Sequence, residues 1–243
     1  MHHTIEHNIL ALLRAGAFRY TEGATLVPMS KHKWRVLAKA AQQLRILPDI
    51  QKGAQMLNSP DAEIIQKEVL SLTPAEEIPV ASAPSLFNHW SDKHLMEVRE
   101  EEMNAPDTSE ETLLLLDAIV ENAYSIIRDD VNVCSMVSIG KKILASKDKV
   151  DKQKLSSWLS YIGLVQVANL QANMLADILM IQPDFIPFYV KPYPSAGKQF
   201  LAAMYSPFRS HSFSTITRLN VAMMETLSYK FTNAITKITD IEE

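Results

Sequence analysis

The sequence predicts an all-α protein, a multi-helix bundle of about nine to eleven helices with at most one minor short hairpin near residue 20. Three observations lead to this prediction. Apolar residues recur at helical spacing through most of the chain, almost no stretch alternates with the period of two that a half-buried strand requires, and only 6 of the 243 residues are glycine. The hydrophobic share of 47% is sufficient for one large core or two small ones.

The clearest predicted helix covers residues 109–128. Thr108 followed by Glu111 matches a capping box and predicts its start. Its apolar residues recur three and four positions apart and are so numerous that little of its circumference is polar. A helix of this kind must be surrounded, so we expect it at the centre of the bundle.

Four helices are expected before residue 90. The first covers residues 4–15, with Gly16 as its stop. Ser30 is expected to cap the second, and the third runs from Pro48 to residue 57. The fourth begins at Ser59 and Pro60 and continues to about residue 72. Residues 20–29 are expected to be irregular or to form a short strand.

Prolines at positions 74, 79 and 84 favour turns and mark a subdomain boundary. We therefore expect an N-terminal helical subdomain over residues 1–90 and a C-terminal helical bundle over 91–243, packed as one unit. In the second part, Asp151 is expected to cap a helix that Gly163 ends. Residues 92–111 contain eight acidic and two basic residues, which we interpret as a solvated helix face and linker; the alternative is a cation or partner site.

The composition argues against several classes of protein. A net charge of -4 excludes a generally basic nucleic-acid binder, and a single cysteine allows no internal disulfide. The N-terminus lacks the pattern of a signal peptide, and no apolar stretch is long enough to span a membrane. We expect a cytoplasmic protein. His3 with His7, and His89 with His94, are too few for a metal site, so no metal and no cofactor are predicted.

One segment, residues 191–218, has the composition of an anion site. It has no acidic residue, and its hydroxyl side chains come just before the start of the last predicted helix, a position that favours anions. The alternative is a loop whose aromatic residues pack on the bundle while its cations are solvated. The candidate anion-binding residues are Lys191, Lys198, Arg209, His211 and Arg218.

The last predicted helix, residues 214–239, is a candidate interface. Methionine-rich surfaces adapt well to partner proteins, and one face of this helix carries Met223, Met224, Leu227 and Phe231. The alternative is that this face packs into the protein's own core. An unknown protein partner or self-association is therefore expected, and a nucleotide or nucleic acid bound by residues 191–218 is a weaker alternative.

Two stretches resemble the helical parts of a bacterial nucleotidyltransferase-like family that is often associated with surface-polysaccharide genes. The first stretch comprises residues 7–16, 34–44 and 50–57, and the second runs from residue 113 to about 205, with residues 150–164 similar to a late helical hairpin of the family. Together they cover about half of the chain. The resemblance implies a helical scaffold with a catalytic palm domain inserted in it.

The residues that carry chemistry in that family are missing from this sequence. A nucleotidyltransferase palm needs a Gly-Ser turn and an Asp-x-Asp pair that holds Mg²⁺, and the chain contains neither. The leading hypothesis is therefore a non-catalytic helical scaffold or protein-interaction protein related to these enzymes, a pseudoenzyme. The alternatives are a nucleotide-binding or nucleotidyl-transferring enzyme with a reduced site, and a nucleic-acid-binding regulator.

Overall fold

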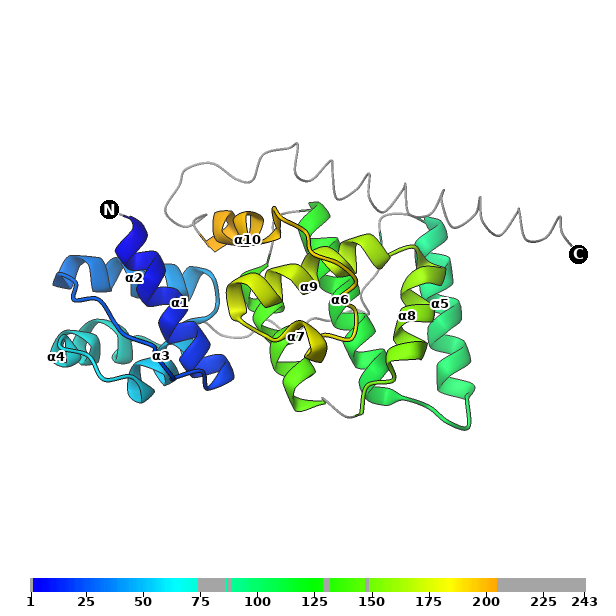
Figure 1. The fold of residues 1–243 in the computed structure, drawn as a ribbon, viewed down its shortest axis with the longest axis horizontal. Helices are drawn as coiled ribbons and strands as arrows, with labels where there is room; N and C mark the ends of the chain where they lie inside the picture. Colours follow the sequence, from blue (N-terminus) through cyan, green and yellow to red (C-terminus); the bar gives the residue numbers. More distant parts are fainter. Residues whose placement is uncertain (1, 74–85, 87–88, 129–131, 147–148, 205–243) are drawn as a thin grey trace, which may run out of the picture.

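The computed structural model describes residues 2–73, 86, 89–128, 132–146 and 149–204 (Figure 1). Within these residues the chain forms ten α-helices and no strand, which confirms the predicted all-α bundle. The α-helices are α1 (His2–Phe18), α2 (Lys31–Gln43), α3 (Leu47–Met56), α4 (Ala62–Ile65), α5 (His89–Asn104), α6 (Glu110–Arg128), α7 (Val133–Ala145), α8 (Lys152–Ile162), α9 (Val165–Leu179) and α10 (Ala196–Met204); a π-helix, η1 (Gln66–Leu70), and a 3-10 turn, η2 (Pro183–Phe185), complete the set.

The helices form two groups along the long axis of the molecule (Figure 1). The first group contains α1 to α4 with η1, and the second contains α5 to α10. Helix α9 contacts α6, α7, α8 and α10 in the second group and α1 in the first, and most of its residues are buried. The sequence predicts α6 at the centre of the bundle. In the structure α9 occupies the centre, although α6 is also largely buried. The predicted boundary at residue 90 falls in the first turn of α5 and stays a prediction.

Two glycines bring α1 and α3 into backbone contact. A Cβ atom on Gly16 would lie 1.8 Å from the carbonyl oxygen of Asp49, and one on Gly53 would lie 2.0 Å from that of Leu12. Such distances leave no space for any side chain, so the two helices can cross this closely only with glycine at both positions. This crossing is the most extensive helix pair in the described part of the protein.

The expectation that Gly16 ends the first helix is therefore wrong. Helix α1 continues to Phe18, and the stop comes at Arg19, which has a left-handed backbone with φ of 61°. The amides of Arg19 and Tyr20 donate to the carbonyls of Ala15 and Arg14, which closes the helix end. A glycine is as suitable for helix packing as for a helix stop, so spacing alone does not separate the two roles.

The stretch from residue 19 to 30 is a loop without a strand, so the short hairpin is not found there. Buried Asn8 holds this loop, because its amide nitrogen donates to the carbonyl of Val27 at 2.8 Å and its oxygen accepts from the amide of Val27 at 2.9 Å. The side chain thus supplies both hydrogen bonds that a neighbouring strand would provide. Leu26 and Met29 are buried on either side of this contact.

The fourth predicted helix is broken into two kinds of helix. Four residues of α4 lead into the π-helix η1 instead of a continuous α-helix to residue 72. Asp61 does not cap α4, because its carboxylate accepts from the amide of Met29 and from the indole nitrogen of Trp34. The side chain of Gln51 donates to the carbonyls of Val69 and Leu72, which satisfies the end of the π-helix.

The predicted capping box at the start of α6 is wrong. Helix α6 begins at Glu110, and the hydroxyl of Thr108 donates to the carbonyls of Glu102, in the last turn of α5, and of Ala105, just after it. Glu102, which is only 5% exposed, accepts from the amide of Ser109 and pairs with Lys154 at 3.2 Å. The acidic stretch over residues 92–111 is therefore not solvated throughout, since the side chain of Glu102 on α5 is buried against α8.

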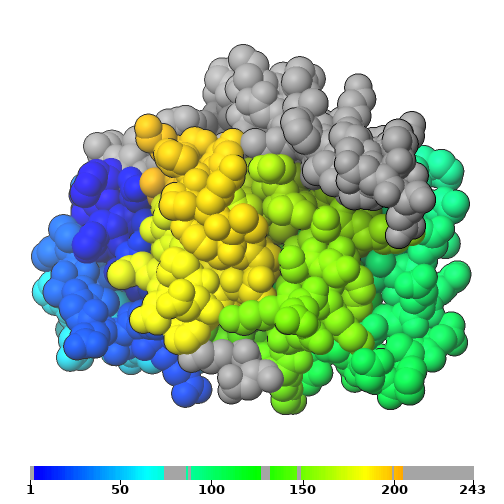
Figure 2. All heavy atoms as spheres, turned by 45° about the vertical axis from the view of Figure 1, so that its right-hand side comes forward, coloured from blue at the N-terminus to red at the C-terminus, as the bar shows by residue number. Residues whose placement is uncertain are grey.

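Polar and apolar contacts join the two groups of helices. Arg14 on α1 donates from Nε to the carbonyl of Ile178 near the end of α9 at 2.9 Å, and Lys141 pairs with Asp49 at 2.6 Å. Burial lowers the pKa of the Arg14 guanidinium, as expected for a cation held at a helix junction. Phe18 and Ile181 pack against Gly140. Figure 2 shows the yellow and orange residues after α9 between the blue N-terminal helices and the green helices of the second group.

The glycine crossing predicts a large loss of stability from one methyl group. We expect Gly16→Ala or Gly53→Ala to lower the free energy of unfolding by about 3 kcal/mol or more, because the new Cβ must displace backbone atoms. Urea denaturation followed by circular dichroism measures this. Gly23→Ala is the matched control: its Cβ would meet nothing within 4 Å, so only the backbone strain of about 1 kcal/mol applies. Equal losses at positions 16 and 23 would contradict the close crossing.

Candidate binding site on the outer face of α8

Helix α8 has a buried inner face and a polar outer face. Asp151 caps its start by accepting from the amides of Gln153 and Lys154, and Gly163 ends it with φ of 84°, as the sequence predicts. Leu155, Leu159 and Ile162 are buried. The outer face lines an open hollow of about 670 Å³ with Lys152, Gln153, Ser156, Ser157, Ser160 and Tyr161. These six residues, all exposed, are called the α8 face below.

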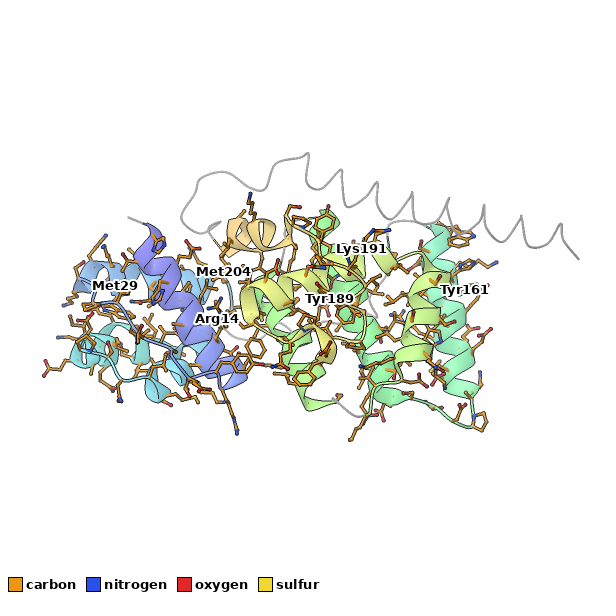
Figure 3. The ribbon with its side chains drawn as sticks, in the orientation of Figure 1. Arg14, Met29, Tyr161, Tyr189, Lys191 and Met204 are labelled. Atoms are coloured by element: carbon orange, nitrogen blue, oxygen red, sulfur yellow. The ribbon has the colours of Figure 1, made fainter. Side chains whose placement is uncertain are left out.

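A column of aromatic rings stands at the C-terminal end of the α8 face. The ring of His94, from α5, stacks on that of Tyr161 with centroids 4.1 Å apart and planes 8° from parallel. The ring of Trp90 also contacts that of His94, with centroids 3.5 Å apart and planes inclined by 60°. The stack covers one face of Tyr161, yet the residue remains 46% exposed and lines the hollow. Figure 3 shows Tyr161 at the α5 side of α8. The exposed part of Tyr161 is therefore available to a ligand.

Hydrogen bonds fix this ring in place. The Tyr161 hydroxyl donates to Glu97 at 2.8 Å, and the Nδ1 of His94 lies 3.0 Å from the carbonyl of Tyr161. A carbonyl only accepts, so Nδ1 carries the proton and Nε2 faces Glu97 at 4.0 Å. The hydrogen bond to Glu97 raises the pKa of Tyr161, and the same bond, ahead of Lys93 and His94, holds the pKa of Glu97 below its ordinary value.

His94 and Glu97 of α5 meet Tyr161 of α8 in a contact that is called the seam below. Its chemistry suits binding better than catalysis. Glu97 is ionised more readily than usual and is held by Tyr161 and by Lys93 at 3.6 Å, so it is a poor general base. Among the described residues, no group of three His, Cys, Asp or Glu is placed to hold a metal ion. The α8 face offers a fixed ring, three serine hydroxyls, one amide and one ammonium group around a hollow.

The predicted anion site is described only at its first two residues. Lys191 and Lys198 are both exposed, Lys191 on the connection that leads to α10 and Lys198 on α10 itself (Figure 3). Arg209, His211 and Arg218 lie outside the described residues. The anion site therefore stays a prediction, and so does the candidate interface of Met223, Met224, Leu227 and Phe231, which lies outside the described residues as well.

Two buried asparagines of α9 fix the backbone around Lys191. Asn169 accepts from the amides of Val190 at 2.8 Å and Lys191 at 3.1 Å, and it donates to the carbonyl of Lys191 at 3.0 Å. Asn173 donates to the same carbonyl at 2.9 Å and accepts from the amide of Tyr193 at 2.8 Å. The two side chains thus hold the backbone of residues 190–193 against α9, and the Lys191 side chain is exposed.

Sequence reasoning did not single out Tyr161 or Glu97, and it weighed His94 only as a metal ligand. The available signal was the acidic stretch over residues 92–111, for which a cation or partner site was the alternative interpretation. Nothing in the sequence pairs residue 97 with residue 161, since the two helices meet only in the folded chain.

Comparisons of the chain with family models, curated proteins and solved structures found no match. None of the helices in the described part combines the length and apolar character needed to cross a bilayer. The function must therefore be inferred from the geometry of the chain's own residues.

The asparagine pair predicts a local effect on the connection before α10. Asn169→Ala removes the acceptor of two amides and one of the two donors to the Lys191 carbonyl, so we expect faster hydrogen exchange at Val190 and Lys191 and a loss of about 2 kcal/mol in unfolding free energy. Native-state hydrogen exchange by NMR measures the first effect, and urea denaturation the second. Asn104→Ala is the control, because exposed Asn104 donates only to the carbonyl of Glu100 within its own helix. Unchanged exchange at residues 190 and 191 would argue against the role of Asn169.

The hydrogen bond between Tyr161 and Glu97 predicts a pH effect. In Tyr161→Phe the pKa of Glu97 should rise toward its ordinary value, because its largest stabilising partner is lost. A lowered carboxyl pKa contributes stability above about pH 4.3 that is lost as pH falls through the folded-state pKa. The variant should therefore lose less stability on acidification. Carbon-detected NMR titration of the Glu97 carboxyl checks this, with Tyr189→Phe as the control. An unchanged Glu97 titration would contradict the hydrogen bond.

Proposed function

We propose that the protein is a non-catalytic helical scaffold that binds a segment of another protein on the α8 face. The observation that carries this proposal is the open hollow of about 670 Å³ that ends at the exposed face of a fixed aromatic ring. An open hollow of this kind offers a contact surface for an extended segment, and a rigid aromatic residue contributes contact area at small entropic cost.

The composition of the α8 face supports a peptide segment as the ligand. Ser156, Ser157 and Ser160 have short side chains, so a partner backbone can approach the helix closely and exchange hydrogen bonds with the hydroxyls. Gln153 can both donate to and accept from a peptide group. Lys152 lies at the far end, where its Nζ contacts the carbonyl of Asp184 at 3.3 Å.

The hydrogen bonds made by polar side chains in the interior support the proposal of a scaffold. Four buried residues, Asn8, Glu102, Asn169 and Asn173, and the partly buried Asp61 could in principle act in catalysis, yet each holds a loop or a helix end. Groups with such fixed partners stabilise the fold and are poorly placed to exchange protons or ligands with a substrate.

We further infer that this scaffold is related to the helical part of the nucleotidyltransferase-like family that the sequence resembles. The support is the sequence pattern of residues 7–16, 34–44, 50–57 and 150–164, which lie mainly on α1, α2, α3 and α8. The chain lacks the Gly-Ser turn and Asp-x-Asp pair of such enzymes, so the relation concerns the scaffold and does not supply an activity.

Filling the hollow should prevent partner binding without unfolding the protein. We expect Ser157→Trp to lower capture of a partner from native cells at least about tenfold, because the indole occupies the hollow that the partner needs. Quantitative mass spectrometry of a pull-down with tagged full-length protein measures this, and thermal denaturation confirms folding. The matched control is Gln55→Trp, which places the same bulk on an exposed position of α3. A partner set that both variants retain equally would rule out the α8 face.

A further inference from the structure

We propose that the seam between α5 and α8 recognises an arginine side chain of the bound segment, with the guanidinium on the free face of Tyr161 and beside the carboxylates of Glu97 and Glu101. This inference rests on the proposed function and names the chemistry of the partner. Three observations concern this place: a tyrosine that stacks on His94 and is still 46% exposed, two nearby carboxylates, and the end of the α8 hollow.

The ring supplies a stacking surface whose position is already fixed. His94 covers one face of Tyr161 at 4.1 Å, and the bond to Glu97 stops the ring from turning away. A flat cation on the open face gains cation–π attraction and stacking, and a guanidinium does so better than the compact, strongly hydrated ammonium of lysine. Little conformational entropy is lost on the protein's side, because the ring is ordered before the ligand arrives.

The charges around the ring favour a cation. Glu97 and Glu101 lie one turn apart on α5, and both carboxylates act electrostatically on the Tyr161 hydroxyl, whose pKa they help to raise. Lys93 offsets one of these charges at 3.6 Å from Glu97, which leaves the second carboxylate in excess. Glu97 is still 35% exposed and Glu101 is exposed, so a guanidinium can reach both and form charge-assisted hydrogen bonds.

The same charges disfavour a nucleotide at this end of the hollow. A nucleobase could stack on Tyr161, but its phosphates would then have to extend past two carboxylates or along the serines to Lys152. Nine residues separate Tyr161 from Lys152, a distance of about 13 Å along the helix, and a single exposed lysine gives weak attraction there. The hydroxyls between the two ends suit the peptide groups that flank an arginine.

The test uses full-length, isotope-labelled protein and three capped tripeptides as probes: Gly-Arg-Gly, Gly-citrulline-Gly and Gly-Lys-Gly. Citrulline has nearly the shape of arginine without its charge. We expect the arginine peptide to shift the NMR signals of Tyr161, Ser157 and Glu97 in a saturable manner, with a Kd on the order of 1 mM. The lysine peptide should bind more weakly, and the citrulline peptide should produce no saturable shift.

Variants separate the seam from general charge attraction. Glu101→Gln should weaken the arginine peptide at least about threefold, and Tyr161→Leu should abolish the saturable shift. Glu100→Gln is the matched control, since it removes the same charge from the neighbouring exposed position of α5 and should leave binding unchanged. Backbone spectra of each variant show whether α5 and α8 remain folded.

Four outcomes would overturn the inference: equal binding of the citrulline peptide, unaltered binding in Glu101→Gln, equal weakening in Glu100→Gln, or stronger shifts of the same residues by adenosine monophosphate. The two proposals fail separately. If Ser157→Trp abolishes partner capture while Glu101→Gln leaves it unchanged, the α8 face is the binding surface and the arginine inference is wrong. If neither variant alters capture, the proposed function is wrong as well.

Discussion

Burial of α9 is the constraint on which the rest of the bundle depends. A helix packed on nearly every side can carry polar groups only where each finds a partner, since an orphaned buried amide costs about 1–3 kcal/mol. Asn169 and Asn173 meet this requirement by binding the connection to α10. Gln171 meets it only in part: its side-chain nitrogen donates to the carbonyl of Ile119 on α6, while its oxygen has no partner in the described part of the protein. Even the last turn of α9 has an outside partner, because Arg14 of the N-terminal group binds the carbonyl of Ile178. One helix therefore sets the positions of the connection, of α10 and of the N-terminal helices.

The polar outer face of α8, the proposed binding surface, follows from this arrangement. Helix α8 turns its leucines toward the core, so the side that α9 and α6 do not cover must be polar. Helix α5 then packs on the edge of α8, and it is held there at both ends: Lys154 pairs with Glu102 near the start of α8, and His94 with Tyr161 near its end. Both contacts involve charged or aromatic groups, and each fixes the direction of α5 more narrowly than apolar packing alone would. These contacts hold the ring of Tyr161 in place at the end of the hollow.

The structural roles and the proposed binding role fall on different polar residues. The buried asparagines, Asp61 and Glu102 are committed to loops and helix ends, while the exposed groups of the α8 face have few partners within the described chain. This division is what a binding scaffold requires, because the groups that contact the partner can change without loss of the fold. The proposed relation to a catalytic family is compatible with this division, because helix packing depends on apolar spacing and small residues, and catalysis on carboxylates that those patterns do not include.

The sequence by itself determined the all-α class, the positions of most helices, and local features such as the Ser30 and Asp151 caps and the Gly163 stop, because these depend on residues within one or two turns of each other. It could not tell a glycine that ends a helix from one that lets two helices touch, as at Gly16, nor an acidic residue in water from one buried beside a distant lysine, as at Glu102. Only the tertiary structure brought Glu97 to Tyr161, since their contact joins residues 64 positions apart. Contacts of this range follow from how the helices pack, and helix packing depends on the whole core and not on any local pattern.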